Sequence, residues 1–206
     1  MIKGKIVESI RGYLLGREPN QDSNGLVSYQ RIVVACDEAF ETMLNAVFDD
    51  NYKSIESNYV KNFENKTLQR LNGKNYLDID DTYVGLPNGL GVWYVKPRGG
   101  TYALPKGGVH HNSFINNLPI GDIVHNSTYK IGYVPNVAGK KILIEHIGDS
   151  IYANTTRWDY GLVRQFSAYD DGEDIFIPHG RYDQFINQVL QWFGKRQIDN
   201  SNNNAE

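Results

Sequence analysis

The motif Gly148-Asp149-Ser150-Ile151 carries the residue best placed for covalent chemistry. It follows the apolar run Ile142-Leu143-Ile144, and a serine held there could act as a nucleophile if a histidine base and an oxyanion hole lay close to it. The only histidine after Ser150 is His179. The same glycine and aspartate could instead form a tight turn between two strands of a hairpin.

This motif resembles the first block of the GDSL-type serine esterases, in which the serine is the nucleophile. In that family the base follows late in the chain, in an Asp-x-x-His block. Here Phe176 stands three residues before His179, and too few residues follow Ser150 for the parallel α/β sheet of that family. The hairpin turn is therefore the favoured interpretation, and an esterase that uses Ser150 stays an alternative.

Other residues that could bind ions or phosphates lack the necessary spacing. The five histidines, none of which falls in a ligand pair at helical spacing, are His110, His111, His125, His146 and His179. The acidic clusters at 78–81 and 170–174 lack the calcium-loop pattern, and the glycine pairs lack the lysine of a phosphate loop. We therefore expect no enzyme, with no catalytic, cofactor-binding or metal-binding residues and no cofactor.

Charge and cysteine content exclude further classes. The 206 residues include 21 Lys and Arg against 24 Asp and Glu, which gives a formal net charge of −3 and no basic excess for binding nucleic acid. The single cysteine, Cys36, cannot form an internal disulfide and lies on the apolar face of a predicted helix. No segment approaches the roughly 18 apolar residues that span a bilayer, and the first residues lack a signal-peptide pattern.

Apolar residues at helical spacing predict an N-terminal helical hairpin. Its first helix spans residues 28–48, with Ser28 as a suitable N-cap. Its second helix spans residues 52–71, with Asn72-Gly73 as the left-handed stop. A short helix is also expected over residues 5–15.

Beyond Gly73 the apolar pattern shifts toward period two, which predicts strands. The expected strands are 76–79, 83–86, 92–96, 129–134, 141–147, 151–155 and 162–169. An amphipathic helix follows over 181–193, with Gly194 as its stop. Because helices and strands are segregated along the chain, the predicted fold class is α+β with an antiparallel β-region.

We expect a single domain over residues 1–206. Its subregions would be a helical part at 1–73, a mainly β part at 74–180, a closing helix at 181–196 and a polar tail at 197–206. Within the β part, residues 98–126 are rich in Gly, Asn and Pro. A loop of that length is usually functional or disordered, so we expect long extended loops there.

Aromatic residues that could be exposed indicate a binding surface. Those that could reach the surface are Trp93, Tyr94, Tyr102, Phe114, Tyr129, Tyr133, Tyr152, Trp158, Tyr160 and Trp192. Most are expected to pack in the core and the sheets. The remainder favour a protein interface, where Tyr and Trp contribute much of the binding energy, or a carbohydrate-stacking face. A carbohydrate-binding β-domain therefore stays a second alternative.

The order of the elements resembles that of a family of phage proteins. Asp174-Ile175-Phe176-Ile177-Pro178 leads into the closing helix, as in the C-terminal part of the head-to-tail connector, tail adaptor and ring proteins of podovirus-like tailed phages, including crAss-like phages. The resemblance covers the layout of the whole chain and is strongest over 141–196. The insertion at 98–126 and the longer N-terminal segment depart from it, so portal-proximal adaptor, lower ring and tail hub all stay open.

The resemblance implies a non-enzymatic virion structural protein of the neck or tail, present in the host cytoplasm during assembly. Its partners would be copies of itself in a ring of about twelve, the portal protein and other neck or tail proteins. DNA would only pass through the channel, and no membrane contact is expected. The helical hairpin would contact ring neighbours or the portal, while the loop and tail would reach adjacent chains.

Overall fold

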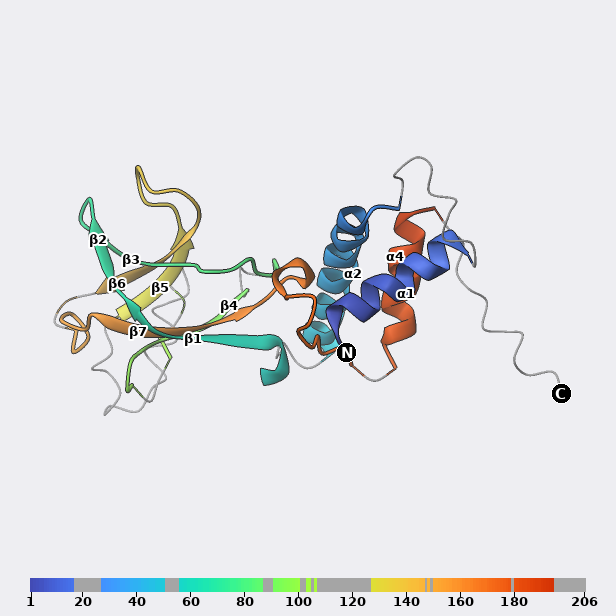
Figure 1. Cartoon of the computed structure of the whole chain (residues 1–206). Helices are drawn as coiled ribbons and strands as arrows, with labels where there is room; N and C mark the ends of the chain where they lie inside the picture. Colours follow the sequence, from blue (N-terminus) through green and yellow to red (C-terminus); the bar gives the residue numbers. More distant parts are fainter. Residues whose placement is uncertain are drawn as a thin grey trace. The chain divides into compact units, whose positions relative to one another are not determined.

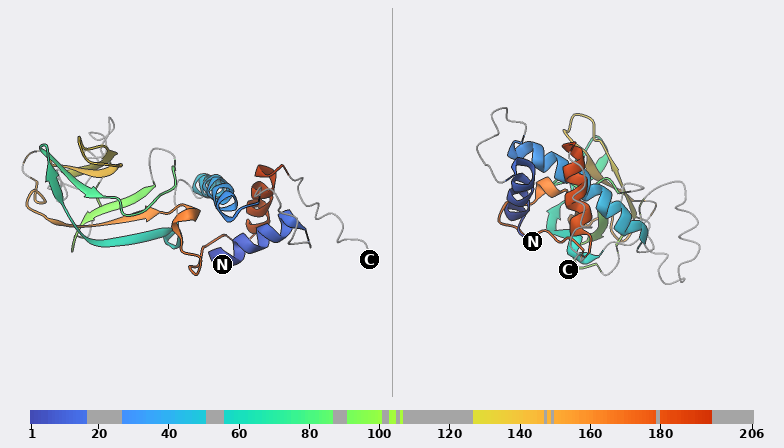
Figure 2. Two further views of the ribbon diagram at one scale, coloured as in Figure 1. Left: turned by 45° about the horizontal axis from the view of Figure 1, so that its top comes forward. Right: turned by 90° about the vertical axis from the view of Figure 1, so that its right-hand side faces the viewer.

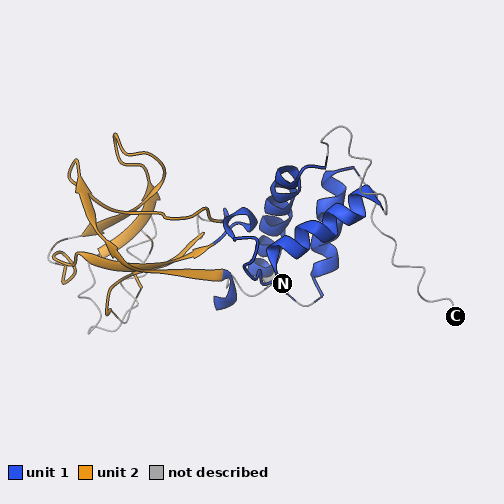
Figure 3. Cartoon of the chain, in the orientation of Figure 1, with its two compact units in different colours: residues 1–59, 84–87, 164–206 blue, residues 60–83, 88–163 orange. Residues whose placement is uncertain are grey.

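The computed structural model describes residues 1–16, 27–50, 56–86, 91–100, 103, 104, 106, 127–146, 148, 150–178 and 180–194. The chain forms two compact units (Figure 3). The helical unit comprises 1–59, 84–87 and 164–206, and the β unit comprises 60–83 and 88–163. The β unit is therefore inserted into the sequence of the helical unit.

Among the described residues, three α-helices build the helical unit: α1 (Lys3–Leu15), α2 (Tyr29–Asp50) and α4 (Tyr182–Trp192). They pack against one another (Figures 1 and 2). The helices predicted over 5–15, 28–48 and 181–193 are thereby confirmed.

The ends of two helices also follow the sequence prediction. The Ser28 hydroxyl caps α2, because its Oγ accepts a hydrogen bond from the backbone N–H of Arg31 at 3.3 Å. Gly194 follows α4 with a φ of +73°, a conformation that glycine adopts without steric cost.

Phe40 of α2 lies at the centre of the helical core. Its ring packs edge-on against Phe166, Tyr169 and Phe185, with ring centroids 6.2–6.5 Å away. Phe166 belongs to a short 3₁₀ helix, η4 (Phe166–Ala168), which follows the β unit in the sequence. The aromatic core thus joins residues that lie before and after the β unit in the sequence. Edge-to-face aromatic pairs of this kind stabilise a core beyond the effect of burying apolar area.

The segment before α4 pairs with the start of the chain. Ile2 and Asp174 form an antiparallel bridge, and the Ile175 N–H donates to the Met1 carbonyl at 2.7 Å. Of the segment 174–178, only Asp174 lies in a bridge, and the segment belongs to neither sheet.

The β unit contains two antiparallel sheets (Figure 1). The three-stranded sheet has the order β1 (Val60–Thr67), β7 (Arg157–Val163), β4 (Val92–Pro97). The four-stranded sheet has the order β2 (Gln69–Leu71), β3 (Lys74–Asp78), β6 (Lys141–His146), β5 (Ser127–Gly132). Both sheets contribute to one core, in which Trp158, Tyr160, Ile142 and Ile144 are buried. The α+β class is confirmed.

The second helix of the predicted hairpin, over 52–71, is wrong wherever the structure describes it. After a short 3₁₀ helix, η1 (Ser57–Tyr59), residues from Val60 onward form β1 and β2, so the helical part does not extend to residue 73. The spacing of the apolar residues fits a helix, but the ladder with β7 supplies the backbone partners instead. Asn72 and Gly73, both with positive φ, form the hairpin turn between β2 and β3 and do not stop a helix.

Several strand predictions also need correction. Residues 83–86 lie outside the strands because Val84 and Leu86 are buried in the helical unit, and 151–155 form turns. The strand predicted over 162–169 begins earlier and ends at Val163. The hairpin predicted at Gly148-Asp149 is wrong, since 151–155 is not a strand and the next strand, β7, belongs to the other sheet. Asp149, residues 107–126 and the polar tail lie outside the described residues.

Gly161 marks a close approach in the central strand of the three-stranded sheet. A Cβ at this position would lie 2.5 Å from Cε1 of Tyr94 and 2.7 Å from Cγ1 of Val60. The Tyr94 hydroxyl donates to Asn62 Oδ1 at 2.9 Å, which fixes the ring across β7. The side chains of both neighbouring strands therefore fill the space that glycine leaves.

We predict that Gly161→Ala lowers the free energy of unfolding by about 1–3 kcal/mol, because the new methyl group overpacks this contact. Chemical denaturation followed by circular dichroism would measure the loss. Gly12→Ala in α1 is the matched control, since a Cβ there meets nothing within 4 Å, and it should stabilise by up to about 1 kcal/mol. Equal effects of the two substitutions would contradict the packing argument.

Candidate functional site

Ser150 lies in a buried chain of hydroxyl groups that ends on a histidine. Its Oγ is 2.5 Å from Oγ of Ser127, which is 2.7 Å from Nδ1 of His146. The Tyr152 N–H donates to Ser150 Oγ at 3.1 Å. Ser127 is fully buried and Ser150 is only 8% exposed, so the network has little contact with solvent.

The four-stranded sheet positions this network. Ser127 and His146 are direct partners at the end of the β5–β6 ladder, so their side chains lie on the same face of the sheet. Ser150 reaches them from the turn that follows β6, where Gly148 has a φ of +63°. The sequence analysis considered His146 only as a metal ligand and did not single out Ser127, because only the strand register shows that they are opposite one another.

The Ser127 hydroxyl lies between two hydrogen-bond partners, Oγ of Ser150 and Nδ1 of His146, and Ser150 Oγ also accepts a hydrogen bond from the Tyr152 N–H. Nε2 of His146 is buried with no hydrogen-bond partner among the described residues. Burial lowers the pKa of His146, because the charged ring would lose hydration.

As a nucleophilic site, this arrangement lacks a direct base. Ser127 lies between Ser150 and the imidazole, so His146 cannot take the Ser150 proton in one step. No carboxylate among the described residues bonds to Nε2 to orient the ring. His179, the only base suggested by the sequence, lies outside the described residues. The network is suited to holding β5, β6 and the following turn together.

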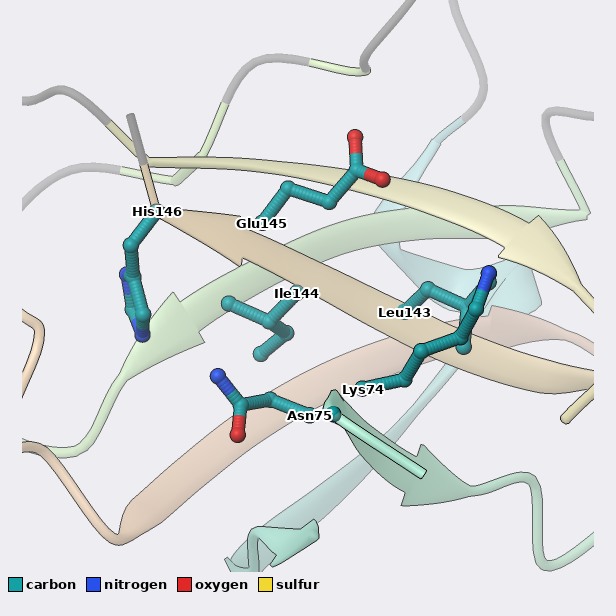
Figure 4. Close-up of a pocket in the computed structure, with 7 residues that line it drawn as sticks. Lys74, Asn75, Leu143, Ile144, Glu145 and His146 are labelled. Carbon is teal, nitrogen blue, oxygen red and sulfur yellow. The ribbon is translucent and has the colours of Figure 1, made fainter. Parts of the chain in front are cut away.

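A groove of about 470 Å³ lies beside the end of β6. Its lining, shown in Figure 4, consists of Gly73, Lys74, Asn75, Leu143, Ile144, Glu145 and His146. The His146 ring and the Asn75 carboxamide project to the same side of β6, on either side of Ile144, whereas Glu145 projects to the opposite side (Figure 4). The groove is thus the open space next to the serine–histidine network.

A second candidate surface lies on α2 and α4, and we call it the helical face. It consists of Arg31 and Val34 of α2 and Trp192 of α4. The Arg31 guanidinium lies 5.8 Å from the centroid of the Trp192 ring. Val34 is 50% exposed and Trp192 is 37% exposed. Arginine and tryptophan are enriched among the residues that dominate the energy of protein interfaces, and a half-exposed valine adds apolar area beside them.

The predicted surface aromatics divide between core and surface. Trp158, Tyr160 and Tyr129 are buried, as expected for sheet packing, while Tyr133 and Trp192 are exposed. Cys36 is buried, and burial raises its pKa above the ordinary range of a thiol, which disfavours the reactive thiolate. In the described part of the chain, no three metal-binding side chains lie together.

The chain matches no family model, no curated protein and no solved structure. Among the described helices, none is both long enough and apolar enough to cross a membrane.

The serine–histidine network predicts a loss of stability in acid. The folded-state pKa of His146 lies below the ordinary value of 6.5. Just below pH 6.5 the imidazole is therefore protonated in the unfolded chain and still neutral in the folded chain. This contribution to stability is present above pH 6.5 and is lost as the pH falls below it. Denaturation of the full chain at pH 7.5 and 5.5 should show a smaller decrease for His146→Gln than for the natural chain. An NMR titration of the imidazole that gives a pKa at or above 6.5 would contradict this.

Ser150 should not react with an active-site phosphonate, because its hydroxyl is hydrogen-bonded to Ser127 and its side chain is buried. The test is mass spectrometry of the full chain after exposure to a fluorophosphonate, with Ser150→Ala as the control. Labelling that disappears in the alanine variant would revive the esterase alternative.

Proposed function

We propose that this chain is a structural protein of a phage virion, a component of the head-to-tail connector or tail ring that acts through contacts with other protein chains. The observation that carries the proposal is the helical face. The layout of the C-terminal part supports it, because the segment 174–178, which pairs with the start of the chain at Asp174, leads into the amphipathic helix α4.

The helical face has the composition of an interface centre. The Trp192 ring packs edge-on against Phe193, with ring centroids 4.9 Å apart, and the Arg31 guanidinium also lies over it. Such a tryptophan is held in place before binding, so little side-chain entropy would be lost when a partner covers it. Burying the exposed part of Val34 and Trp192 would then contribute directly to association.

A closed ring requires two different adhesive surfaces on each copy, because each copy contacts one neighbour on each side. The helical face would supply one of them. The β unit carries its own exposed apolar side chains, including Tyr133, which is 65% exposed, and Ile151, which is 55% exposed. In the proposed ring of about twelve copies, these two regions would face neighbouring chains, and the portal or other neck and tail proteins would bind above or below.

Self-association of the full chain tests this function. Sedimentation velocity across a concentration series, with native mass spectrometry of the largest species, should detect oligomers that close at a ring. Trp192→Ala should weaken the association at least about tenfold, which is the effect of removing an interface hot spot.

Gln191→Ala provides the matched control, because Gln191 is an exposed neighbour of Trp192 in α4 and lies outside the helical face. The control should assemble like the natural chain. A protein that stays monomeric up to about 1 mM, or a Trp192→Ala variant that assembles normally, would argue against a ring formed through this face.

A further inference from the structure

Strand β1 forms an open edge of the three-stranded sheet. It pairs with β7 on one side, and no other described strand lies on its second side (Figure 1). The edge of β4 is partly covered, because the Leu104 N–H donates to the Val95 carbonyl at 2.6 Å. Lys106 bridges to Tyr129 on the edge of β5, and β2 has only three residues. Proteins usually cover or shorten such edges, because another strand can pair with them.

The hydrogen bonds of β7 show which backbone groups of β1 are used inside the sheet. The carbonyl of Arg157 and the N–H of Val163 bond to the residues that flank β4. Backbone groups of successive residues point to opposite sides of a strand, so the even-numbered residues of β7 bond on the side of β1. Their partners there include Lys61 and Phe63. The N–H and C=O groups of these two residues therefore point toward β7.

The residues that alternate with them, Val60, Asn62 and Glu64, direct their N–H and C=O groups away from the sheet. None of these outward groups has a hydrogen-bond partner among the described residues. Alternate residues of a strand lie about 7 Å apart, so the outward groups repeat at the spacing of a strand ladder. The ligand that matches this repeat is the extended backbone of another strand.

A β-bulge bounds the open stretch. The register with β7 shifts between Phe63 and Lys66. Within the bulge Asn65 has a φ of +57°, and its N–H donates to Oδ1 of Asp159 at 2.8 Å. A second strand therefore finds a regular edge only over residues 60–64. Bulges of this kind limit edge-to-edge association, so a short, defined pair is favoured over an open-ended fibre.

This short edge is complementary to a second copy of itself. In an antiparallel pair with a two-fold axis at Asn62, this residue lies opposite its own copy, and Val60 lies opposite Glu64 of the second copy. The outward donors and acceptors of both copies then all pair. Lys61 lies opposite Phe63 of the second copy. Its Nζ lies 5.7 Å from the centroid of its own Phe63 ring, so the pair repeats a cation–π contact that the chain already makes.

The side chain of Asn62 is oriented for this contact. Its Oδ1 accepts a hydrogen bond from the Tyr94 hydroxyl at 2.9 Å, which fixes the carboxamide, and the residue is exposed. An amide oxygen accepts two hydrogen bonds, so each carboxamide can also accept from Nδ2 of the other across the axis. Lys61 and Glu64 supply one charge of each sign, so two copies meet without net repulsion.

We propose that two copies of the chain pair through the edge of β1 at residues 60–64 and join their three-stranded sheets into one. The inference goes beyond the proposed function. A two-fold contact stops at two copies and does not use the helical face, whereas a ring is built from head-to-tail contacts. The pair therefore forms with or without the ring.

Charge exchange at Asn62 tests the pairing, because the axis places this residue against its own copy. Asn62→Lys and Asn62→Glu are each made in the full chain that carries Trp192→Ala, so that the helical face does not contribute. Sedimentation velocity of the Trp192→Ala parent at up to about 1 mM should show a dimer. Each charged variant alone should associate about three- to tenfold more weakly, because like charges lie directly opposite one another and the amide pair is lost.

An equal mixture of the two charged variants should recover most of the association, because a lysine then faces a glutamate. Native mass spectrometry with one variant labelled with ¹⁵N identifies the mixed dimer. Asn154→Lys and Asn154→Glu are the matched controls at an exposed asparagine of a turn, and they should associate like the parent, alone and mixed. A parent that is monomeric at about 1 mM would overturn the inference, as would charged Asn62 variants that associate normally or a mixture that recovers nothing.

Hydrogen exchange measured by NMR gives a second result that needs no substitution in β1. In the parent, protection of the Asn62 and Glu64 amides should rise with protein concentration, whereas the Lys61 and Phe63 amides are protected throughout by β7. A dimer with unchanged exchange at Asn62 and Glu64 would overturn the inference. Failure of the proposed assembly looks different, because the natural chain would then associate no further than the Trp192→Ala parent.

Discussion

The helical unit depends on one buried ammonium group. Lys3 is 6% exposed, and its Nζ donates to the carbonyl of Tyr169 at 2.5 Å and to the carbonyl of Ser167 at 3.3 Å, with Asp171 at 3.6 Å. A buried charge is tolerated only when such groups replace its hydration. Lys3 therefore fixes α1 to the segment that follows the β unit. The aromatic core around Phe40 packs against the same segment, through Phe166 and Tyr169. The helical unit forms only when parts of the chain separated by the whole insertion come together.

The β unit has a comparable polar link between its sheets. The Tyr160 hydroxyl of β7 lies 2.7 Å from Oδ2 of Asp80 and 2.9 Å from the carbonyl of Asp78, and Lys66 of β1 lies 2.7 Å from the same Asp80 oxygen. A phenol buried in an apolar core requires such acceptors. This link lies at the Asp78 end of β3, whereas the Ser127–His146 pair closes the end of β6 beside the groove. Each candidate surface therefore lies on a unit whose own core and polar contacts keep it rigid.

The sequence predicted the elements whose signal is local. The apolar stripe of α2, the Ser28 cap and the amphipathic α4 follow from local spacing, and so do the strands β3, β4, β5 and β6. It failed over 60–67, where pairing with distant β7 decided the conformation, and over 69–71, which pair with β3 across the Asn72-Gly73 turn, itself a strong hairpin signal. The serine–histidine network could not be predicted, because Ser127 and His146 meet only through strand register. Ser150 was a candidate because of the residues that flank it in the sequence, but the nearest members of its network, Ser127 and His146, lie in β5 and β6.

The two boundaries of the β unit meet in space. Val60, its first residue, and Val163, its last, are cross-strand partners at the start of the β1–β7 ladder. Adjacent partners lie only about 5 Å apart, so the helical unit needs to bridge no more than the width of one strand pair to accept the insertion. Residues 84–87 return to the helical unit, so the β unit is inserted as two segments, 60–83 and 88–163. The architecture thus allows the outer parts of the β unit to diverge or lengthen while the helical host stays the same.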